Sequence, residues 1–229
     1  MGRAILNPSP RTEGACRRGG TVRIRLGEWR GIPRRLPFTI TMESVILAIA
    51  FLDGAMVGHL SWADRLRWGF SAADLTGVGA YTLLTGAFFV RTPLMLLGIL
   101  VFVPFALGLY ERRRGTRRAL ALFWSANVLG FALIGLLTLP AFGAAPFMPH
   151  GEVGPSVGGV ACLGAWVTAL PSGRRRACLY GIAALYLVGK IVFFRDPAGD
   201  LEHLIAFPLG MTMEWLTRKP EGPADSHAR

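Results

Sequence analysis

The sequence predicts an all-α fold, namely a polytopic membrane bundle of six transmembrane helices with both termini in the cytoplasm. Three observations lead to this prediction. Charged residues make up only 17% of the 229 residues, whereas a soluble domain carries roughly 25%. Hydrophobic residues make up 52% and occur in runs longer than strands require, and the mean hydropathy is +0.43. The basic residues, finally, gather in alternate loops, as they do in membrane proteins.

The first segment, residues 1–36, is rich in Arg, Gly and Pro and has no apolar periodicity. We expect it to be a mostly disordered, basic cytoplasmic arm. No apolar stretch followed by a small-residue cleavage site occurs near its start, so a cleaved signal peptide is not expected. The expected partner of its arginines is anionic lipid of the inner leaflet. Nucleic acid is the alternative partner, and it is not expected because topology already explains the net charge of +11.

Six apolar runs follow within residues 37–217, and we expect each of them to cross the bilayer. A spanning helix needs roughly 20 mostly apolar residues, and several of these runs are at the short end of that range. The first run contains Glu43 and Asp53, which makes it the least typical of the six. Residues 218–229 are expected to be a short cytoplasmic tail. The runs are residues 38–58, 94–110, 119–140, 153–170, 178–194 and 201–216.

Residues 62–90, between the first two runs, mix aromatic and polar side chains. We expect a loop with interfacial helices, because aromatic rings settle at the level of the lipid headgroups. The competing interpretation is a seventh span that ends near Val90.

The distribution of charge decides between these topologies. The arm carries nine Arg, and the loops after the second, fourth and sixth runs add five, three and two basic residues, so one side holds 19 of the 25. Cytoplasmic loops collect Lys and Arg, and six spans with both termini inside satisfy this rule at every crossing. A seventh span would break it. Six of the 14 acids lie in the other loops, at Asp64, Asp74, Glu152, Asp196, Asp200 and Glu202.

Polar residues within spans are costly and often functional, and two of them form the informative pair. Ser156 begins the fourth run and His203 begins the sixth, so their depths match if both helices run inward. An imidazole can accept the proton of a serine hydroxyl and activate it as a nucleophile. The alternatives are that Ser156 is a helix cap and that His203 is only solvated.

Small residues indicate that the two helices touch. Gly154 and Gly158 have a GxxxG spacing, and small residues let membrane helices approach closely. His203, Ala206 and Gly210 lie along one stripe of the sixth helix. We therefore expect Gly158, Ala206 and Gly210 to be packing residues.

Other polar residues within the runs leave a second class of function open. Glu43, Asp53, Asn127 and Lys190 favour a small transporter or channel, although no pair of broken spans indicates an inverted repeat. The three cysteines, Cys16, Cys162 and Cys178, form no CxxC motif and no disulfide framework. No metal or cofactor is expected.

At these residues the chain resembles the rhomboid family of intramembrane serine proteases. Gly154-Pro155-Ser156 is similar to the start of the family's GxSG motif, and residues 202–210 are similar to its AHxxGxxxG stretch. Residues 107–115 are similar to the end of its second helix, where a Glu–Arg pair precedes a Gly. The resemblance implies that Ser156 is the nucleophile and His203 the general base. It implies that the substrate is a transmembrane helix of a client protein.

The chain also departs from that pattern. Val157 replaces the second Gly of the serine motif, while Glu202 and Ala206 replace Ala and Gly around the histidine. The family binds the oxyanion with a His and an Asn on its second helix, and the matching positions here are Met95 and Ile99. The backbone of Ser156, with Gly154 before it, or the side chain of His150 is a candidate substitute. A catalytically inactive rhomboid-like protein that binds client helices therefore remains the alternative to a protease.

Overall fold

The computed structural model describes residues 36–71, 74–75, 77–142, 151–194 and 197–217. Within these residues the predicted all-α class is confirmed: eight α-helices and two short 3₁₀ helices are present, and no strand. The predicted arm, the tail after residue 217 and His150 lie outside the described residues.

Six longer helices correspond to the six apolar runs. They are α2 (Pro37–Leu52), α5 (Pro93–Arg114), α6 (Thr116–Phe142), α7 (Ser156–Ala169), α8 (Arg174–Phe194) and α9 (Pro197–Thr217). Proline stands in the first turn of α2 and α5, where its missing N–H costs no helical hydrogen bond.

Two helices are shorter than the apolar runs that predicted them, whereas α5, α6, α8 and α9 extend a few residues beyond their runs. Helix α2 ends at Leu52 rather than near residue 58, because Asp53 caps it and turns follow. Residues 153–155 are not helical, so α7 is only 14 residues long. By length and composition, two helices of the described chain could cross a membrane, Pro93–Arg114 and Thr116–Leu137. Helices α2 and α7 are apolar but shorter.

The segment between α2 and α5 contains only short helices. They are α3 (Trp62–Trp68), η3 (Val78–Tyr81), α4 (Thr82–Thr85) and η4 (Gly86–Phe88). Ser61 caps α3 by accepting a hydrogen bond from the backbone N–H of Asp64. The longest of these helices has seven residues, so the described part of residues 62–90 has no room for the competing seventh span.

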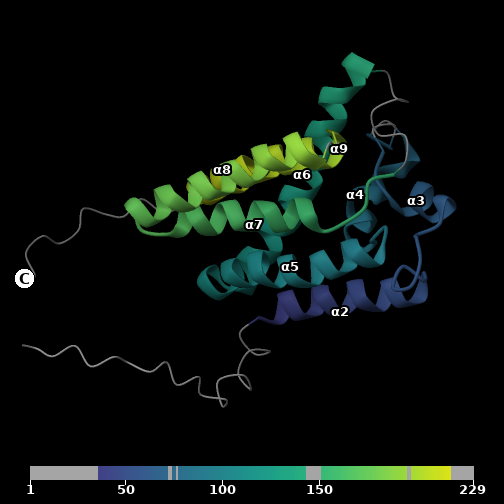
Figure 1. Cartoon of the computed structure of the whole chain (residues 1–229), viewed down its shortest axis with the longest axis horizontal. Helices are drawn as coiled ribbons and strands as arrows, with labels where there is room; N and C mark the ends of the chain where they lie inside the picture. The colour runs from purple at the N-terminus through teal and green to yellow at the C-terminus, as the bar shows by residue number, and fades with distance from the viewer. Residues whose placement is uncertain (1–35, 72–73, 76, 143–150, 195–196, 218–229) are drawn as a thin grey trace, which may run out of the picture.

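Figure 1 shows α2, α5, α7, α8 and α9 roughly aligned, while α6 crosses them steeply. Helix α7 lies at the centre and contacts α5, α6 and α9. All its residues except Ser156, Leu163 and Trp166 are buried. A helix buried on nearly every side does not need a lipid-facing stripe, which explains how a helix this short fits into the bundle.

Helices α7 and α9 form the most extensive helix–helix contact in the described chain. At their crossing, a Cβ added to Gly210 would lie 2.6 Å from the carbonyl carbon of Ala161. A Cβ added to Gly164 would lie 3.2 Å from the carbonyl carbon of Phe207. The two glycines therefore let the helix backbones touch, as small residues do in membrane helix pairs.

The contact between these helices was predicted, but one of its residues was not. Gly158 faces α6, where an added Cβ would lie 2.6 Å from the ring of Phe123. Gly154 precedes the helix. The Gly154–Gly158 spacing therefore does not form the α7–α9 contact, and Gly164 takes its place.

The end of the bundle where α5 finishes holds the buried carboxylate of Glu111. It accepts hydrogen bonds from the backbone N–H groups of Phe38 and Thr39, at 3.0 and 2.9 Å. It also accepts from the hydroxyls of Thr39 and Thr116, at 2.6 and 2.8 Å. The N-cap residue of α2, Leu36, makes no side-chain capping bond. Glu111 of α5 therefore provides the acceptor for the free N–H groups in the first turn of α2.

A second buried carboxylate ties α9 to the same end of α5. Glu214 accepts a hydrogen bond from the hydroxyl of Tyr110 at 2.7 Å and forms an ion pair with Arg114. The C-terminal ends of α5 and α9 therefore lie together.

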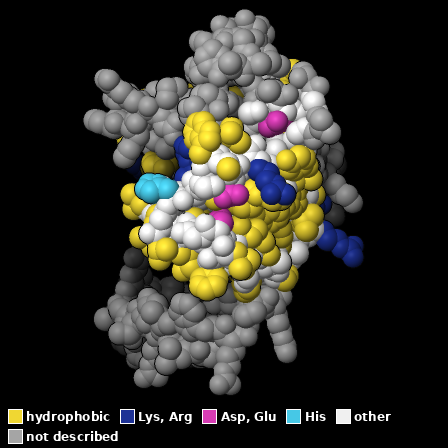
Figure 2. All heavy atoms as spheres, turned by 90° about the vertical axis from the view of Figure 1, so that its right-hand side faces the viewer, with side chains coloured by type: hydrophobic (Ala, Val, Ile, Leu, Met, Phe, Trp, Pro, Cys, Tyr) yellow, Lys and Arg dark blue, Asp and Glu magenta, His cyan; other side chains and the backbone are white. Residues whose placement is uncertain are grey.

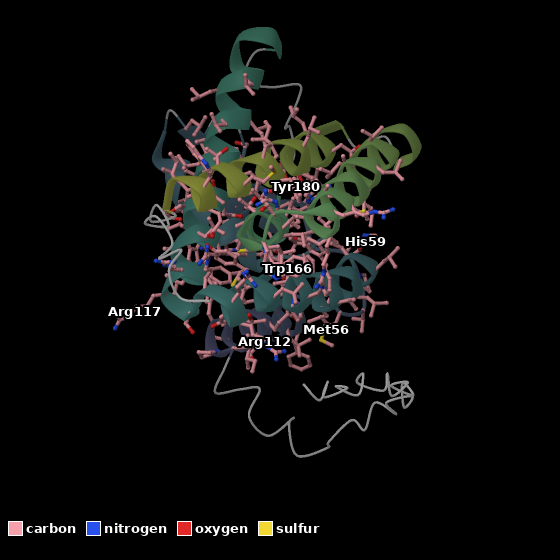
Figure 3. All side chains as sticks on the ribbon, turned by 90° about the vertical axis from the view of Figure 1, so that its left-hand side faces the viewer. Met56, His59, Arg112, Arg117, Trp166 and Tyr180 are labelled. Atoms are coloured by element: carbon pink, nitrogen blue, oxygen red, sulfur yellow. The ribbon has the colours of Figure 1, made fainter. Side chains whose placement is uncertain are left out.

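Arginines crowd this end of the bundle. Arg113 donates to the carbonyl of Ala169 at the end of α7, and Arg176 donates to the next carbonyl, that of Leu170. Figure 3 looks onto this end and shows Arg117 pointing away from the helices. The arginines of the α5–α6 turn and of the start of α8 are Arg112, Arg113, Arg114, Arg117, Arg118, Arg174, Arg175 and Arg176.

Candidate functional site

The opposite end of the bundle contains a cavity of about 350 Å³. Ser156 at the start of α7 and His203 of α9 both line it. We call it the Ser156–His203 cavity. Figure 2 looks onto this end and shows acidic and basic side chains close together among hydrophobic ones.

The backbone before α7 sets the position of Ser156. Glu152 pairs with Phe70 in an isolated antiparallel bridge, with N···O distances of 2.8 and 2.6 Å. Gly154 then donates to the carbonyl of Gly86 at 2.8 Å. The segment between α2 and α5 therefore holds the chain that leads into the serine.

Ser156 is the first residue of α7, and the N-cap is Pro155, which has no side-chain capping bond. Ser156 is therefore not the N-cap residue of α7, which was the alternative role predicted for it. Gly154 has φ +128°, a conformation that side chains disfavour. This glycine lets the chain turn into the helix, and the Ser156 side chain lies on the incompletely buried side of α7.

His203 reaches the cavity because of the α7–α9 crossing. Helices α7 and α9 run in the same direction (Figure 1), and Ser156 and His203 both lie toward the N-terminal side of the crossing. Ala206, one turn further along α9, is fully buried, and Gly210 lies at the crossing itself. The predicted stripe of His203, Ala206 and Gly210 thus follows the side of α9 that packs on its neighbours.

Met95 and Ile99 of α5 line the same cavity. A Cβ added to Gly154 would lie 2.6 Å from Met95 Cε, 3.8 Å from Ser156 Oγ and 3.9 Å from Ile99 Cδ1. The thioether, the isoleucine and the serine hydroxyl therefore converge on one glycine. Neither Met95 nor Ile99 carries an N–H or O–H donor on its side chain.

Sequence reasoning missed the polar residues that complete the cavity wall. Arg91 and Glu152 form an ion pair at 3.6 Å, and Tyr186 of α8 and Glu202 of α9 also line the cavity. One signal could have found Arg91, because it stands directly before Thr92–Pro93, where a helix begins, and is one of only three arginines between the first two apolar runs. Glu152 appeared only as one acid among several.

Other polar residues weighed for transport lie apart from this cavity. The Asn127 side chain in α6 donates to the carbonyl of Leu83 at 2.9 Å and so ties α4 to the bundle. Asp53 caps the end of α2 and accepts from the N–H of Ala55. Neither lines the Ser156–His203 cavity.

Among the described residues, no cluster of three or more His, Cys, Asp or Glu side chains is arranged to hold a metal ion. Cys162 is buried and Cys178 is exposed, and both are free thiols.

The arrangement defines a helical protein with a serine–histidine cavity lined by residues of four helices, α5, α7, α8 and α9. Neither a protein-family model nor a curated protein sequence matches the chain.

Proposed function

We propose that this protein is a rhomboid-like intramembrane serine protease, which hydrolyses a peptide bond in or near a transmembrane helix of a client protein. The observation that carries the proposal is the single cavity that Ser156 and His203 line from two different helices. A hydroxyl as nucleophile and an imidazole as its general base are the two side chains that acyl transfer requires at a minimum.

The apolar outer surface of the bundle supports a membrane location. Along α5, four large side chains on one face are each more than half exposed: Leu94, Leu97, Val101 and Phe105. Helix α8 exposes Ile182, Leu185 and Val188 in the same way. Soluble monomers rarely expose contiguous apolar patches above a few hundred Å², so these faces suit lipid.

The polar interior supports the same location. Glu111, Asn127 and Glu214 are buried within the bundle while hydrophobic side chains cover its outside. Ionisable groups at membrane depth face the protein interior in this way.

The ends of the bundle support six spans with both termini cytoplasmic. The start of α2 and the ends of α5 and α9 lie together through Glu111 and Glu214. The arginine-rich turns are at this end too, as the positive-inside rule requires of a cytoplasmic face. The Ser156–His203 cavity then opens toward the outer side of the cell membrane.

The proposed reaction follows from the two side chains. Ser156 Oγ attacks the scissile carbonyl carbon and its proton passes to the imidazole of His203, while the carbonyl electron pair moves onto oxygen. Collapse of this intermediate breaks the C–N bond, and the departing amine takes the proton from His203. Water then attacks the acyl-enzyme with His203 as base, which releases the carboxylate and restores the serine.

The client helix must be locally unwound at the cleavage site. Hydrogen-bonded helical backbone hides its carbonyl carbon from a nucleophile, so helix-breaking residues in the client favour cleavage. The apolar walls of the cavity, among them Phe102 and Val160, suit an apolar client segment.

A second candidate is a rhomboid-like protein that binds client helices without cutting them. Met95 and Ile99 favour it, because they line the cavity and offer no side-chain donor to an oxyanion. Loss of one such donor lowers the rate by about 10²- to 10³-fold in a known serine protease.

A fluorophosphonate probe distinguishes the two candidates. We expect it to label the purified full-length protein in detergent micelles, and Ser156→Ala to abolish labelling. His203→Ala should reduce labelling strongly, because the hydroxyl loses its base. Ser125→Ala is the matched control, since Ser125 of α6 lines a different cavity, and its labelling should equal that of the wild-type protein.

Absence of labelling in protein that unfolds cooperatively would refute the protease. The non-catalytic candidate then predicts that a synthetic transmembrane peptide with a central Gly-Pro pair is bound equally by the wild-type, Ser156→Ala and His203→Ala proteins.

A further inference from the structure

The side chains of Met95 and Ile99 cannot donate a hydrogen bond to an oxyanion. The same cavity is lined by the positively charged side chain of Arg91. We propose that Arg91 supplies the hydrogen-bond donor that stabilises the oxyanion during attack by Ser156. This inference rests on the proposed function and names a catalytic residue within it.

The composition of the cavity wall singles out Arg91. Ser156 and His203 are committed to attack and to proton transfer, while the carboxylates of Glu152 and Glu202 accept hydrogen bonds. Two side-chain donors remain in the wall, the guanidinium of Arg91 and the hydroxyl of Tyr186. Tyr186 lies on α8, and most of its surface is exposed.

The position of Arg91 is fixed at three points. Its carbonyl accepts from the N–H of Leu60 at 3.0 Å, and its own N–H donates to Met95 Sδ at 3.4 Å. Its guanidinium lies 3.6 Å from the carboxylate of Glu152. A donor held in place before the reaction stabilises developing charge without the cost of reorganisation.

Glu152 ties this donor to the nucleophile. Its backbone is held in the bridge with Phe70, and its side chain is about nine-tenths buried. Four residues later the chain reaches Ser156. The ion pair therefore keeps the guanidinium beside the segment that carries the serine.

The chemistry of the guanidinium suits this task. Arginine has five N–H donors in a planar fork and stays protonated at any physiological pH. It can therefore donate to Glu152 and to an oxyanion, and it does not lose a proton when the tetrahedral intermediate forms. The proton of Ser156 still passes to His203 alone, so the proton balance of the reaction is unchanged.

The test compares second-order rate constants for fluorophosphonate labelling of Ser156 in the full-length protein. The phosphonyl oxygen gains negative charge during this reaction, as a carbonyl oxygen does. We expect Arg91→Gln to lower the rate constant by about 10²- to 10³-fold. Arg91→Lys keeps the charge and the ion pair but loses the fork, so we expect a smaller loss, about tenfold.

Glu152→Gln provides the discriminating control, because it removes the charge of Glu152 but keeps an amide oxygen that can still accept a hydrogen bond from the guanidinium and hold it in place. We expect it to lower the rate constant by much less than Arg91→Gln does. Equal losses in these two variants would mean that Arg91 acts only as a structural partner of Glu152, and the inference would be wrong. A rate constant for Arg91→Gln within threefold of the wild-type value would also overturn it.

One further measurement keeps these outcomes separate. The unfolding midpoint in detergent shows whether Arg91→Gln is folded. If Arg91→Gln is unfolded, the rate constant of Arg91→Lys is compared with the wild-type value instead. Labelling of the wild-type protein at Ser156 with a normal rate in Arg91→Gln would refute this inference alone. No labelling of the wild-type protein would instead refute the proposed protease.

Discussion

The α7–α9 crossing gives the sharpest prediction, because one added methyl group should separate the two helices. In Gly210→Ala the new Cβ would lie 2.6 Å from the carbonyl carbon of Ala161 and 2.7 Å from its Cα. Carbon atoms pack at about 3.5–4.0 Å, so α9 must move outward by about 1 Å. The obstacle is backbone, which cannot rotate away as a side chain can.

The energy of this overlap can be bounded. Overpacking a core costs about 1–3 kcal/mol, and replacing a helical glycine by alanine gains up to about 1 kcal/mol in helix propensity. Gly181→Ala in α8 isolates the second effect, since an added Cβ there meets nothing within 4 Å. We therefore expect Gly210→Ala to be less stable than Gly181→Ala by about 1–3 kcal/mol.

Unfolding of both purified variants by denaturant, in the same detergent, measures this difference. The shift should also carry His203 away from Ser156, and a displacement of 1 Å can cost about 10²-fold in rate. We therefore expect fluorophosphonate labelling of Gly210→Ala to fall by about that factor under conditions where it is folded. Stability equal to that of Gly181→Ala would show that the helices do not touch as described.

Three further substitutions test the ends of the bundle. Glu111→Gln places an amide N–H₂ group where the buried N–H and O–H donors need an acceptor. We expect its free energy of unfolding to fall by at least about 2 kcal/mol, relative to the control Thr212→Ala, which changes an exposed residue. Glu214→Gln weakens the bond from Tyr110 and the ion pair at the end of α9, and a lower unfolding midpoint with unchanged Ser156 labelling is expected while the protein is folded. Gly154→Ala forces a side chain into φ +128°, which costs about 1–3 kcal/mol; we expect slower Ser156 labelling, and an unchanged rate would show that the turn does not position the serine.

The helices could be predicted because long apolar runs leave few alternatives. The predicted boundaries failed where local chemistry, rather than hydropathy, ends a helix. Asp53 is polar and caps α2, although apolar residues continue after it. Residues 153–155 are apolar yet not helical, because Glu152 and Gly154 bond to the segment between α2 and α5. Such pairings depend on how a distant segment folds, so no local pattern reveals them.

The same reason separates the residues of the cavity that were predicted from those that were not. Ser156 begins the fourth apolar run and His203 lies near the start of the sixth, so a topology based on charge predicts similar depths for them. Arg91 and Glu152 come together only through the loop that carries the Phe70 bridge. Their ion pair is a property of the assembled end of the bundle, and a count of charges along the chain can only place both on the same side.

Helix α7 shows why small residues reveal that helices pack but not which helices. Gly158 faces Phe123 of α6, Gly159 faces Phe102 of α5, and Gly164 faces the backbone of α9. Small residues occur on every face of α7, and every face packs against a neighbour. Their spacing therefore has no periodicity that identifies one partner helix. Gly130 of α6 also faces α7, but it meets the side chain of Val157, whereas Gly210 of α9 and Gly164 of α7 each meet the backbone of the other helix. The close approach of α7 and α9 therefore requires glycines on both helices at once, which is why Gly210 and Gly164, rather than the Gly154–Gly158 spacing, set the separation of the helices that carry Ser156 and His203.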